Sequence, residues 1–365
     1  MSSPPEHDTT DALFEPLTIG PLQLRNRVVM APMTRRKAPD DCVPDDAIAA
    51  YYERRAAGGV GLIITEGTHV DGVHAPDSPN VPGLYTDAQR DGWARVVERV
   101  HGAGGAIACQ LWHTGRHAMD PIAPSPIPAP KRGGGFKPTP RQMTDADIAQ
   151  AQHAFAEAAT RAKDAGFDAV EIHGAHGYLL DSFISEETNQ RNDVYGGFFQ
   201  QRLRFPMQVV RAVRRAVGPG YPVIYRFSQW KVEKAEAMNY PDPDTLSLFV
   251  SALREAGVDI LHVSTRSATD AAFAGSNRTL AGWSRTLSGL PTIAVGSVSL
   301  SSGMDQGAPA VTDPGPAAAL IDEGEADMLA VGRALIANPN WAHIVRAGQW
   351  QDLRPYDVAM LETLD

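Results

Sequence analysis

The sequence predicts a single-domain α/β protein folded as a (β/α)₈ TIM barrel. Three observations predict it: eight short apolar runs rich in β-branched residues, helical stretches between them, and a repeated junction in which a helix ends at a glycine shortly before the next run. Continuous apolar runs are typical of strands buried on both faces of a parallel sheet. Their alternation with helices is typical of a repeating β/α unit. An open doubly wound sheet is the alternative, but no Gly-x-Gly-x-x-Gly follows the first run.

The elements follow in order along the chain. The predicted strands lie at residues 28–33, 61–66, 106–111, 169–173, 222–227, 260–264, 291–296 and 328–333. The predicted helices lie at 45–57, 87–103, 145–165, 200–216, 244–256 and 315–323. Thr144 and Asp242 stand where an N-cap is needed, since their side-chain oxygens accept from the first turn of a helix. Glycines at 58, 166, 257 and 324 end four of the helices.

Two connections are longer than the others and rich in loop-forming or polar residues. They span residues 114–143, after the third strand, and 175–199, after the fourth. Because both follow strands, both are expected at the C-terminal face of the barrel, where active sites are built in this fold. A plain surface insertion is the alternative, but long ordered loops at that face more often line a site.

Composition excludes several classes of protein. Lys and Arg total 33 against 43 Asp and Glu, a formal charge of −10, which argues against nucleic acid or an anionic membrane as the main partner. Two cysteines, Cys42 and Cys109, exclude a disulfide scaffold and a cysteine metal site. Residues 1–12 are polar and are expected as a flexible tail, not a signal peptide, and no apolar stretch is long enough for a membrane span. We therefore expect a cytoplasmic protein.

The ends of the predicted strands are unusually polar. The side chains there include Thr34, Thr65, Glu66, Gln110, His113, His173, His176, Arg226, Ser264, Thr265, Ser297 and Arg333. The core of a barrel needs none of these groups. Since the strands are parallel, all of them meet at one rim, which is the predicted position of the active site.

His173 and His176 follow one strand end, with Tyr178 two residues further on. Two imidazoles at this spacing suit either a metal ion, for which we find no third ligand, or two hydrogen bonds to one carbonyl oxygen. Tyr178 is able to supply a proton. A rim of satisfied polar side chains is the alternative. The histidine pair and the tyrosine together favour a catalytic group.

Two further features suit an anion. Arg226 ends an apolar strand, where a buried cation is costly unless it faces an anion, an electron-rich ring or a barrel carboxylate such as Glu66 or Glu171. Both interpretations of Arg226 stay open from position alone. The seventh and eighth strands end in Gly296-Ser297 and Gly332-Arg333, which favour a phosphate site over simple tight turns.

Five separated motifs resemble the Old Yellow Enzyme family of FMN-dependent ene reductases. They are Leu13 through Thr34, Gln110-Leu111-Trp112-His113-Thr114-Gly115-Arg116, His173-Gly174-Ala175-His176-Gly177-Tyr178-Leu179-Leu180, Asn189 through Gly197, and Val331-Gly332-Arg333. They occur in the family's order, and the resemblance extends from Leu13 to Trp341.

The resemblance implies a barrel at residues 13–350 that holds FMN without a covalent bond, followed by a C-terminal tail at 351–365. The positions that match flavin contacts are Pro32, Met33, Thr34, Gly67, Gln110, Arg226, Gly296, Ser297, Gly332 and Arg333. Thr34 would tune the flavin, Gln110 would hold its pyrimidine end, and Arg226 would stabilise negative charge on the reduced ring. The two glycines, Ser297 and Arg333 would bind the phosphate.

The resemblance also implies a ping-pong reaction. NADPH or NADH reduces FMN and leaves, and flavin N5 then gives hydride to the β-carbon of an α,β-unsaturated carbonyl compound such as an enone, enal or maleimide. His173 and His176 hold the substrate oxygen, and Tyr178 donates the proton, since a free tyrosine stays protonated at neutral pH. A monomer or a homodimer is expected.

Three alternatives remain open at this point. The first is an FMN barrel with another redox reaction, such as reduction of nitro or nitrate-ester groups or desaturation. The second is a flavin-binding protein without efficient turnover, and the third is a flavin-free phosphate-binding lyase or isomerase that uses His173 and Tyr178 as acid and base. The chain departs from the family at 198–202 and 227–231, so it resembles an outlying branch. Four aromatic side chains are candidates for pocket walls or for core packing: Trp112, Phe198, Phe199 and Trp230.

Overall fold

Eight parallel strands close into a barrel in the computed structural model, which describes residues 10–131, 133–301 and 309–365. They are β3 (Val28–Met30), β4 (Leu62–Ile64), β6 (Ala106–Trp112), β9 (Ala169–His173), β10 (Val223–Ser228), β11 (Ile260–Ser264), β12 (Thr292–Val295) and β13 (Met328–Val331). The ring runs β4-β3-β13-β12-β11-β10-β9-β6, and it closes because β4 also pairs with β6. The predicted fold is confirmed, and each predicted run overlaps one strand.

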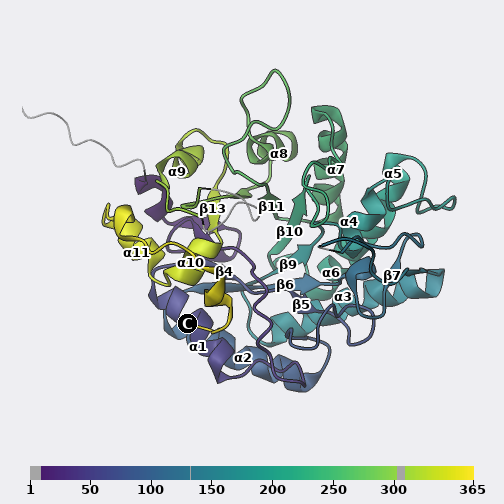
Figure 1. Cartoon of the computed structure of the whole chain (residues 1–365), viewed down its shortest axis with the longest axis horizontal. Coiled ribbons are helices and arrows are strands. Elements are labelled where there is room, and N and C mark those ends of the chain that lie inside the picture. The colour runs from purple at the N-terminus through teal and green to yellow at the C-terminus, as the bar shows by residue number, and fades with distance from the viewer. Residues whose placement is uncertain (1–9, 132, 302–308) are drawn as a thin grey trace, which may run out of the picture.

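Helices surround this ring of strands (Figure 1). They are α1 (Asp46–Ala57), α2 (Asp87–Gly102), α3 (Asp145–Asp164), α4 (Leu179–Ile184), α5 (Phe199–Arg202), α6 (Arg204–Val217), α7 (Pro243–Ala256), α8 (Leu280–Ser288), α9 (Gly315–Asp322), α10 (Arg333–Ala337) and α11 (Trp341–Arg346). Thr144 and Asp242 cap α3 and α7, as predicted.

Some boundaries differ from the prediction. The helix predicted at 200–216 is two helices, α5 and α6, which meet at Leu203. Helix α8 was not predicted, because its nine residues include Gly and three Ser or Thr residues that weaken the apolar pattern. The last strand ends at Val331, two residues earlier than predicted, and Arg333 begins α10.

The barrel interior follows from the alternation of side chains along each strand, since every second residue faces the same side. The lower interior is apolar and contains Val29, Leu62, Ile64, Ala108, Ala169, Ile224, Ile260, Ile293, Met328 and Ala330. A hairpin of β1 (Leu17–Ile19) and β2 (Leu22–Leu24) packs into the same cluster and covers it at the end where the strands begin.

The same alternation places polar residues higher in the barrel. Two residues beyond the apolar positions come Gln110, Glu171, Arg226 and His262, and two residues further come Trp112, His173, Ser228 and Ser264. Glu171 contacts His262 although β9 and β11 are not neighbours in the ring, so this contact crosses the interior. The interior therefore changes from apolar to polar towards the carboxyl ends of the strands.

The two long connections lie at those carboxyl ends, as predicted. The first contains β7 (Ile122–Ala123) and β8 (Arg141–Gln142), which pair in parallel, and the second contains α4. Nη1 of Arg191, in the second connection, donates to the carbonyl oxygens of Met143 at 2.7 Å and Pro124 at 3.3 Å in the first. The two connections are thus bonded to each other.

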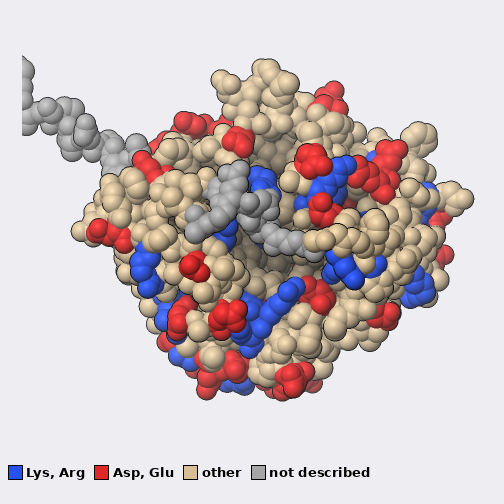
Figure 2. Space-filling model, viewed as in Figure 1, with Lys and Arg blue, Asp and Glu red and all other residues tan. Residues whose placement is uncertain are grey.

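The chain end lies against α1 and the segment after β3. Arg55 donates to a carbonyl oxygen of Asp365 at 2.6 Å, and Arg35 donates to those of Met360 and Thr363. Among the described residues, no helix is both long enough and apolar enough to cross a membrane. On the face in Figure 2, positive and negative side chains are interspersed.

Candidate active site

The predicted histidine pair lies at the carboxyl end of β9. The ring centroids of His173 and His176 are 5.1 Å apart, with their planes at 86°. His176 has φ of 65°, a left-handed backbone that costs a non-glycine residue about 1 kcal/mol. This turn brings the second imidazole back beside the first. Both side chains are buried.

The hydrogen bonds of the two rings differ. Nδ1 of His173 accepts from the N–H of Ala175 at 3.3 Å, so a neutral His173 carries its proton on Nε2 and is able to donate from there. Nε2 of His176 lies 2.9 Å from Oγ of Ser264. A hydrogen bond from His176 to a ligand therefore comes from Nδ1, or replaces the bond to Ser264.

Burial controls the charge of these histidines. It lowers the pKa of His173 and the pKa of His176 well below the usual value for imidazole, and the Arg226 guanidinium lowers them further. Both rings are therefore neutral at physiological pH, and each offers one N–H donor. No group of three or more His, Cys, Asp or Glu side chains in the described parts of the chain forms a metal site.

Tyr178 stands among aromatic rings. Its ring is edge-on to Trp112, His117 and His173, with centroid distances of 5.0, 5.3 and 5.1 Å. Burial and the nearby Asp77 carboxylate raise the pKa of Tyr178 above its usual value. The phenol therefore keeps its proton at neutral pH, which a proton donor requires.

Two carboxylates, Asp77 and Glu233, raise the pKa of Tyr178 by their charge, and each has an arginine and a histidine beside it. Glu233 pairs with Arg116, and its Oε2 lies 3.5 Å from Nε2 of His117. Asp77 pairs with Arg36, and its Oδ1 lies 3.8 Å from Nε2 of His69. Burial lowers the pKa of His117 to about 3 and the pKa of His69 to about 3, so both imidazoles are neutral. Sequence reasoning missed this arrangement, because its members come from four separate segments of the chain.

Arg226 has no carboxylate partner among the described residues. Its Nη2 donates to Oγ of Ser264 at 3.3 Å, and its buried Nε has no hydrogen-bond partner there. Of the two alternatives, an ion pair with Glu66 or Glu171 is wrong. Glu66 accepts from the backbone N–H of Arg35 at 2.9 Å instead. A buried guanidinium with an unused donor fits an anionic or electron-rich group above it.

Glu171 lies beneath this site in the barrel interior. Its Oε1 accepts from Nε2 of Gln110 at 2.7 Å, and its Oε2 lies 2.6 Å from Nδ1 of His262. The bond to Glu171 fixes the amide of Gln110 with its nitrogen turned to Glu171, which leaves its carbonyl oxygen as the atom for a ligand. Glu171 lies two residues before His173 on β9, so the alternation of side chains places both in the barrel interior. His262 was not predicted as part of the site.

The predicted flavin positions at the other strands surround the same rim. Pro32, Met33 and Thr34 follow β3 and are partly exposed. Gly67 is required by Trp112, since a Cβ there would lie 2.3 Å from the indole ring. Beside Gly332 the nearest atom to such a Cβ is Sδ of Met33 at 3.7 Å. The backbone at Gly332 is therefore open to a close ligand.

Gly296 and Ser297 are also engaged in protein packing. A Cβ on Gly296 would lie 2.8 Å from the backbone of the segment 265–268. Ser297 donates its hydroxyl to the carbonyl oxygen of Arg266 at 2.8 Å. Arg333 lies 5.6 Å from the ring centroid of Tyr356. Phosphate binding by these residues stays a prediction.

The four aromatic candidates divide into two pairs. Trp112 stacks on His69 and His173, and the Trp230 ring lies 4.2 Å from that of His176. Both indoles therefore belong to the site. Phe198 is exposed on the surface, and Phe199 contacts Tyr240 away from the histidine pair.

Comparison with known proteins supports this picture. A family model described as NADH:flavin oxidoreductase / NADH oxidase matches residues 12–351. The chain belongs to this family. A curated relative, the NADPH dehydrogenase of Geobacillus thermodenitrificans, is 36% identical over 91% of this chain and 92% of its own length. The family is the one that the sequence motifs resemble, the Old Yellow Enzyme family.

Two further comparisons extend the likeness. The NADH oxidase of Thermoanaerobacter brockii is 37% identical over 94% of this chain. The chain spans about half the length of this and the other first curated relatives (52%, 50% and 56%). The structure of morphinone reductase in complex with tetrahydroNAD superposes with a TM-score of 0.80 at 34% identity, covering 96% of this chain and 93% of that one.

Members of the Old Yellow Enzyme family bind FMN and use NAD(P)H, and the residues present here fit that cofactor. The Arg226 guanidinium, whose Nε has no hydrogen-bond partner in the described parts of the chain, suits the flavin ring. The open backbone at Gly332 suits a close ligand, and the fixed amide of Gln110 offers an acceptor. These three groups stand at the ends of β10, β13 and β6, on one rim of the barrel. The predicted cofactor class therefore agrees with the structure and the family.

Proposed function

We propose that this Old Yellow Enzyme family member is an FMN-dependent ene reductase, in which NADPH or NADH and an α,β-unsaturated carbonyl compound react in turn at one site. The observation that carries the proposal is a group of side chains near the adjoining ends of β9 and β10. They are two neutral imidazoles, a protonated phenol and a buried guanidinium that has no carboxylate partner among the described residues. The likeness to a morphinone reductase complexed with a nicotinamide nucleotide analogue supports the electron donor.

The proposed cofactor contacts are those expected from the sequence. They are Pro32, Met33, Thr34, Gly67, Gln110, Arg226, Gly296, Ser297, Gly332 and Arg333. Bound FMN would supply a hydride acceptor for the nucleotide and a hydride donor for the alkene. Arg226 would compensate negative charge on the cofactor, because its guanidinium has no carboxylate partner among the described residues.

The proposed catalytic residues are His173, His176 and Tyr178. Nε2 of His173 and one ring nitrogen of His176 donate to the substrate carbonyl oxygen and stabilise its developing negative charge. Tyr178 gives its phenolic proton to the α-carbon, and its raised pKa keeps that proton available. Trp112 fixes the phenol from one side and His117 from another.

The test is an absorption spectrum of the purified protein before and after anaerobic addition of NADPH and then cyclohexenone. We expect a flavin band that NADPH bleaches and the enone restores. A band that only NADPH affects contradicts enone reduction and favours nitro or nitrate-ester substrates, or a flavoprotein without efficient turnover. No band after addition of FMN contradicts the whole proposal and favours a flavin-free lyase or isomerase.

A further inference from the structure

The end of β10 and the segment that follows it bind the turn that carries His176 and Tyr178, two of the proposed catalytic groups. Oγ of Ser228 accepts from the N–H of His176 at 3.0 Å, and the N–H of Val232 donates to the carbonyl oxygen of His176 at 3.2 Å. Oγ of Ser228 also donates to the carbonyl oxygen of Trp230 at 2.6 Å. Both backbone polar groups of His176 are therefore held by one neighbouring segment.

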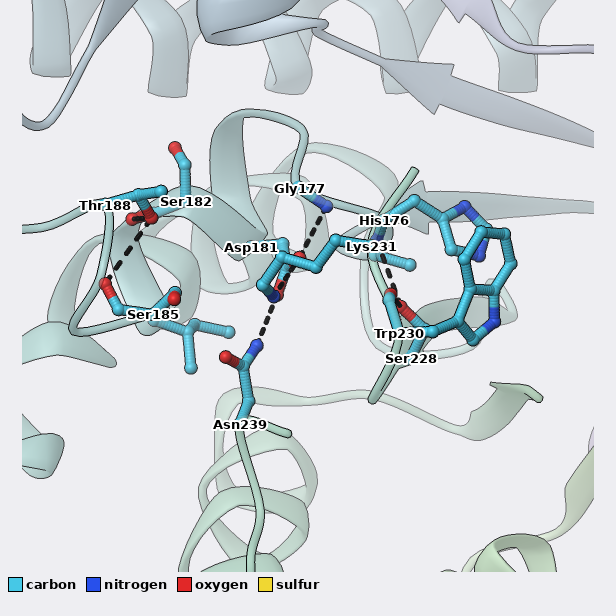
Figure 3. Close-up of polar contacts among 12 residues, drawn as sticks. His176, Gly177, Asp181, Ser182, Ser185, Thr188, Ser228, Trp230, Lys231 and Asn239 are labelled. Carbon is cyan, nitrogen blue, oxygen red and sulfur yellow. Dashed lines mark hydrogen bonds and ion pairs between the residues drawn. The ribbon is translucent and has the colours of Figure 1, made fainter. Parts of the chain in front are cut away.

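A buried ion pair completes this attachment (Figure 3). Nζ of Lys231 lies 2.7 Å from Oδ2 of Asp181, and the two side chains are 4% and 1% exposed. The same Oδ2 accepts from the N–H of Gly177 at 2.5 Å. Asn239 donates to Oδ1 of Asp181, also at 2.5 Å. Lysine, glycine N–H and asparagine thus supply the donors that a buried carboxylate needs.

The position of Gly177 gives this pair its importance. Gly177 lies between His176 and Tyr178, and both it and His176 have left-handed backbones, with φ of 84° and 65°. A shift of Gly177 would move the imidazole on one side and the phenol on the other.

Trp230 acts on the same imidazole through its side chain. Its ring centroid is 4.2 Å from that of His176, with the planes at 32°, and Figure 3 shows the indole beside the imidazole. Lys231 is the next residue, and its own backbone is fixed by a hydrogen bond to the carbonyl oxygen of Lys234 at 2.9 Å. The segment that departs from the family pattern is thus the segment that contacts His176.

We propose that Lys231 is a positioning residue for the carbonyl-holding and proton-donating groups. By pairing with Asp181 it fixes the acceptor of the Gly177 N–H, and through that turn it orients His176 and Tyr178. The indole of Trp230, which lies beside the imidazole, limits its rotation. This inference rests on the proposed function. The alternative is a lysine that only stabilises the fold.

The experiment compares Lys231→Met with Lys234→Met in the FMN-loaded protein. Lys234 is a matched control, since it is three residues away and its Nζ is 2.6 Å from Glu187 in a partly exposed pair. The readouts are the dissociation constant of 4-hydroxybenzaldehyde from the flavin absorbance, and kcat and KM for cyclohexenone. The phenolic oxygen probes the histidine pair because it accepts the same hydrogen bonds as the substrate oxygen.

We expect Lys231→Met to weaken phenol binding and to lower kcat/KM for the enone by about tenfold each, while Lys234→Met changes either by less than about twofold. In a His176→Ala background, Lys231→Met should cause at most a small further loss of phenol affinity, because the two residues act on one contact. Lys231→Arg should restore most of the affinity, since it keeps the cation beside Asp181.

Two results would overturn the inference. One is a Lys231→Met protein with a lowered unfolding midpoint but the phenol affinity of the control. The second result comes from another variant, Asn239→Ala, which replaces Lys231→Met if that protein does not fold. Asn239→Ala, which removes one donor to Asp181 at a half-buried position, is then expected to weaken phenol binding about threefold. Unchanged affinity in that variant would refute the proposal.

The two proposals fail in different ways. If the wild-type protein binds FMN and the phenol but does not oxidise NADPH with the enone, the proposed function is wrong. Phenol affinity still reports on Lys231 in that case, because it needs the histidine pair and no turnover.

Discussion

Oε2 of Glu171 and Nδ1 of His262 lie 2.6 Å apart across the barrel interior, and both side chains are fully buried. Burial lowers the pKa of His262, while the carboxylate of Glu171 opposes that shift. The same carboxylate raises the pKa of Arg226, whose pKa burial otherwise lowers. Glu171 forms no ion pair with Arg226, but its negative charge favours the charged form of that guanidinium in the barrel interior.

Glu171→Gln tests this relationship. The amide keeps the shape but loses the negative charge that Gln110 and His262 contact and that favours the Arg226 guanidinium. We expect the free energy of unfolding to fall by about 3 kcal/mol, as is typical when one partner of a buried charged group is removed. The measurement is the urea midpoint of the FMN-loaded protein. Glu157→Gln, in an exposed pair on α3, is the control, and an equal effect of the two substitutions would contradict the argument.

Tyr178→Phe removes the proposed proton donor and keeps the ring that packs on Trp112. Loss of a general acid typically costs a factor of about 10² to 10⁴, so the enone half-reaction should slow by at least about 100-fold. Reduction of the flavin by NADPH should persist within about threefold, because that step needs no proton from the phenol. Anaerobic stopped-flow absorbance separates the two half-reactions. An unchanged enone rate would exclude Tyr178 as the donor.

The pKa directions of the site predict a flat pH profile for the enone half-reaction. Because the pKa of His173 and that of His176 are lowered, both rings stay neutral as the pH falls through the usual imidazole value. Because the pKa of Tyr178 is raised, the phenol stays protonated as the pH rises. We expect the rate constant to vary by less than about threefold between pH 6 and 9. A step of one proton near pH 6.5 would show that a histidine titrates.

Glu66 predicts a pH dependence of stability. Burial raises its pKa to about 7, although the N–H groups of Arg35 and Arg36 oppose the shift. Between pH 4.5, the ordinary pKa of a glutamate, and about pH 7, Glu66 is protonated in the folded state and ionised in the unfolded state. The free energy of unfolding therefore falls as the pH rises through this range. Glu66→Gln removes this dependence.

The size of that effect follows from linkage. The difference in unfolding free energy between Glu66→Gln and the wild type should shift by about 3 kcal/mol in favour of the variant from pH 4.5 to pH 8. This shift does not depend on which protein is more stable at a single pH. Urea titrations at several pH values measure the difference. A difference that does not depend on pH would show that Glu66 is ionised throughout.

Much of the barrel was predictable because its signals are local. Each strand is an apolar run. Because the strands are parallel, the residue that ends each run lies near the same rim of the barrel, independently of the connections between strands. Helix α4 was hidden inside a predicted loop, since six residues give too little pattern to identify a helix. The end of the chain gave no sign that Arg35 and Arg55 would bind its carbonyl groups.

The residues of the site were predictable where local sequence marks them, as for the barrel. The residues at strand ends were found, and His173, Tyr178 and Arg226 are brought together by the parallel order of β9 and β10. Lys231 and Asp181 were not found, because nothing local marks a lysine and an aspartate 50 positions apart as partners. Glu171 was considered only as a partner of Arg226, whereas its bonds go to Gln110 and His262. Pairings of this kind depend on three-dimensional proximity alone.

The bond between the two long connections has a consequence for protein engineering. Arg191 binds Met143 and Pro124, and the N–H of Gln190 donates to Oγ of Ser125 at 2.9 Å. A connection transplanted alone from a relative would lose these partners and leave buried carbonyl groups unsatisfied. Chimeras that alter substrate range should therefore exchange residues 114–143 and 175–199 as one cassette. Directed evolution of either connection is expected to select compensating changes in the other.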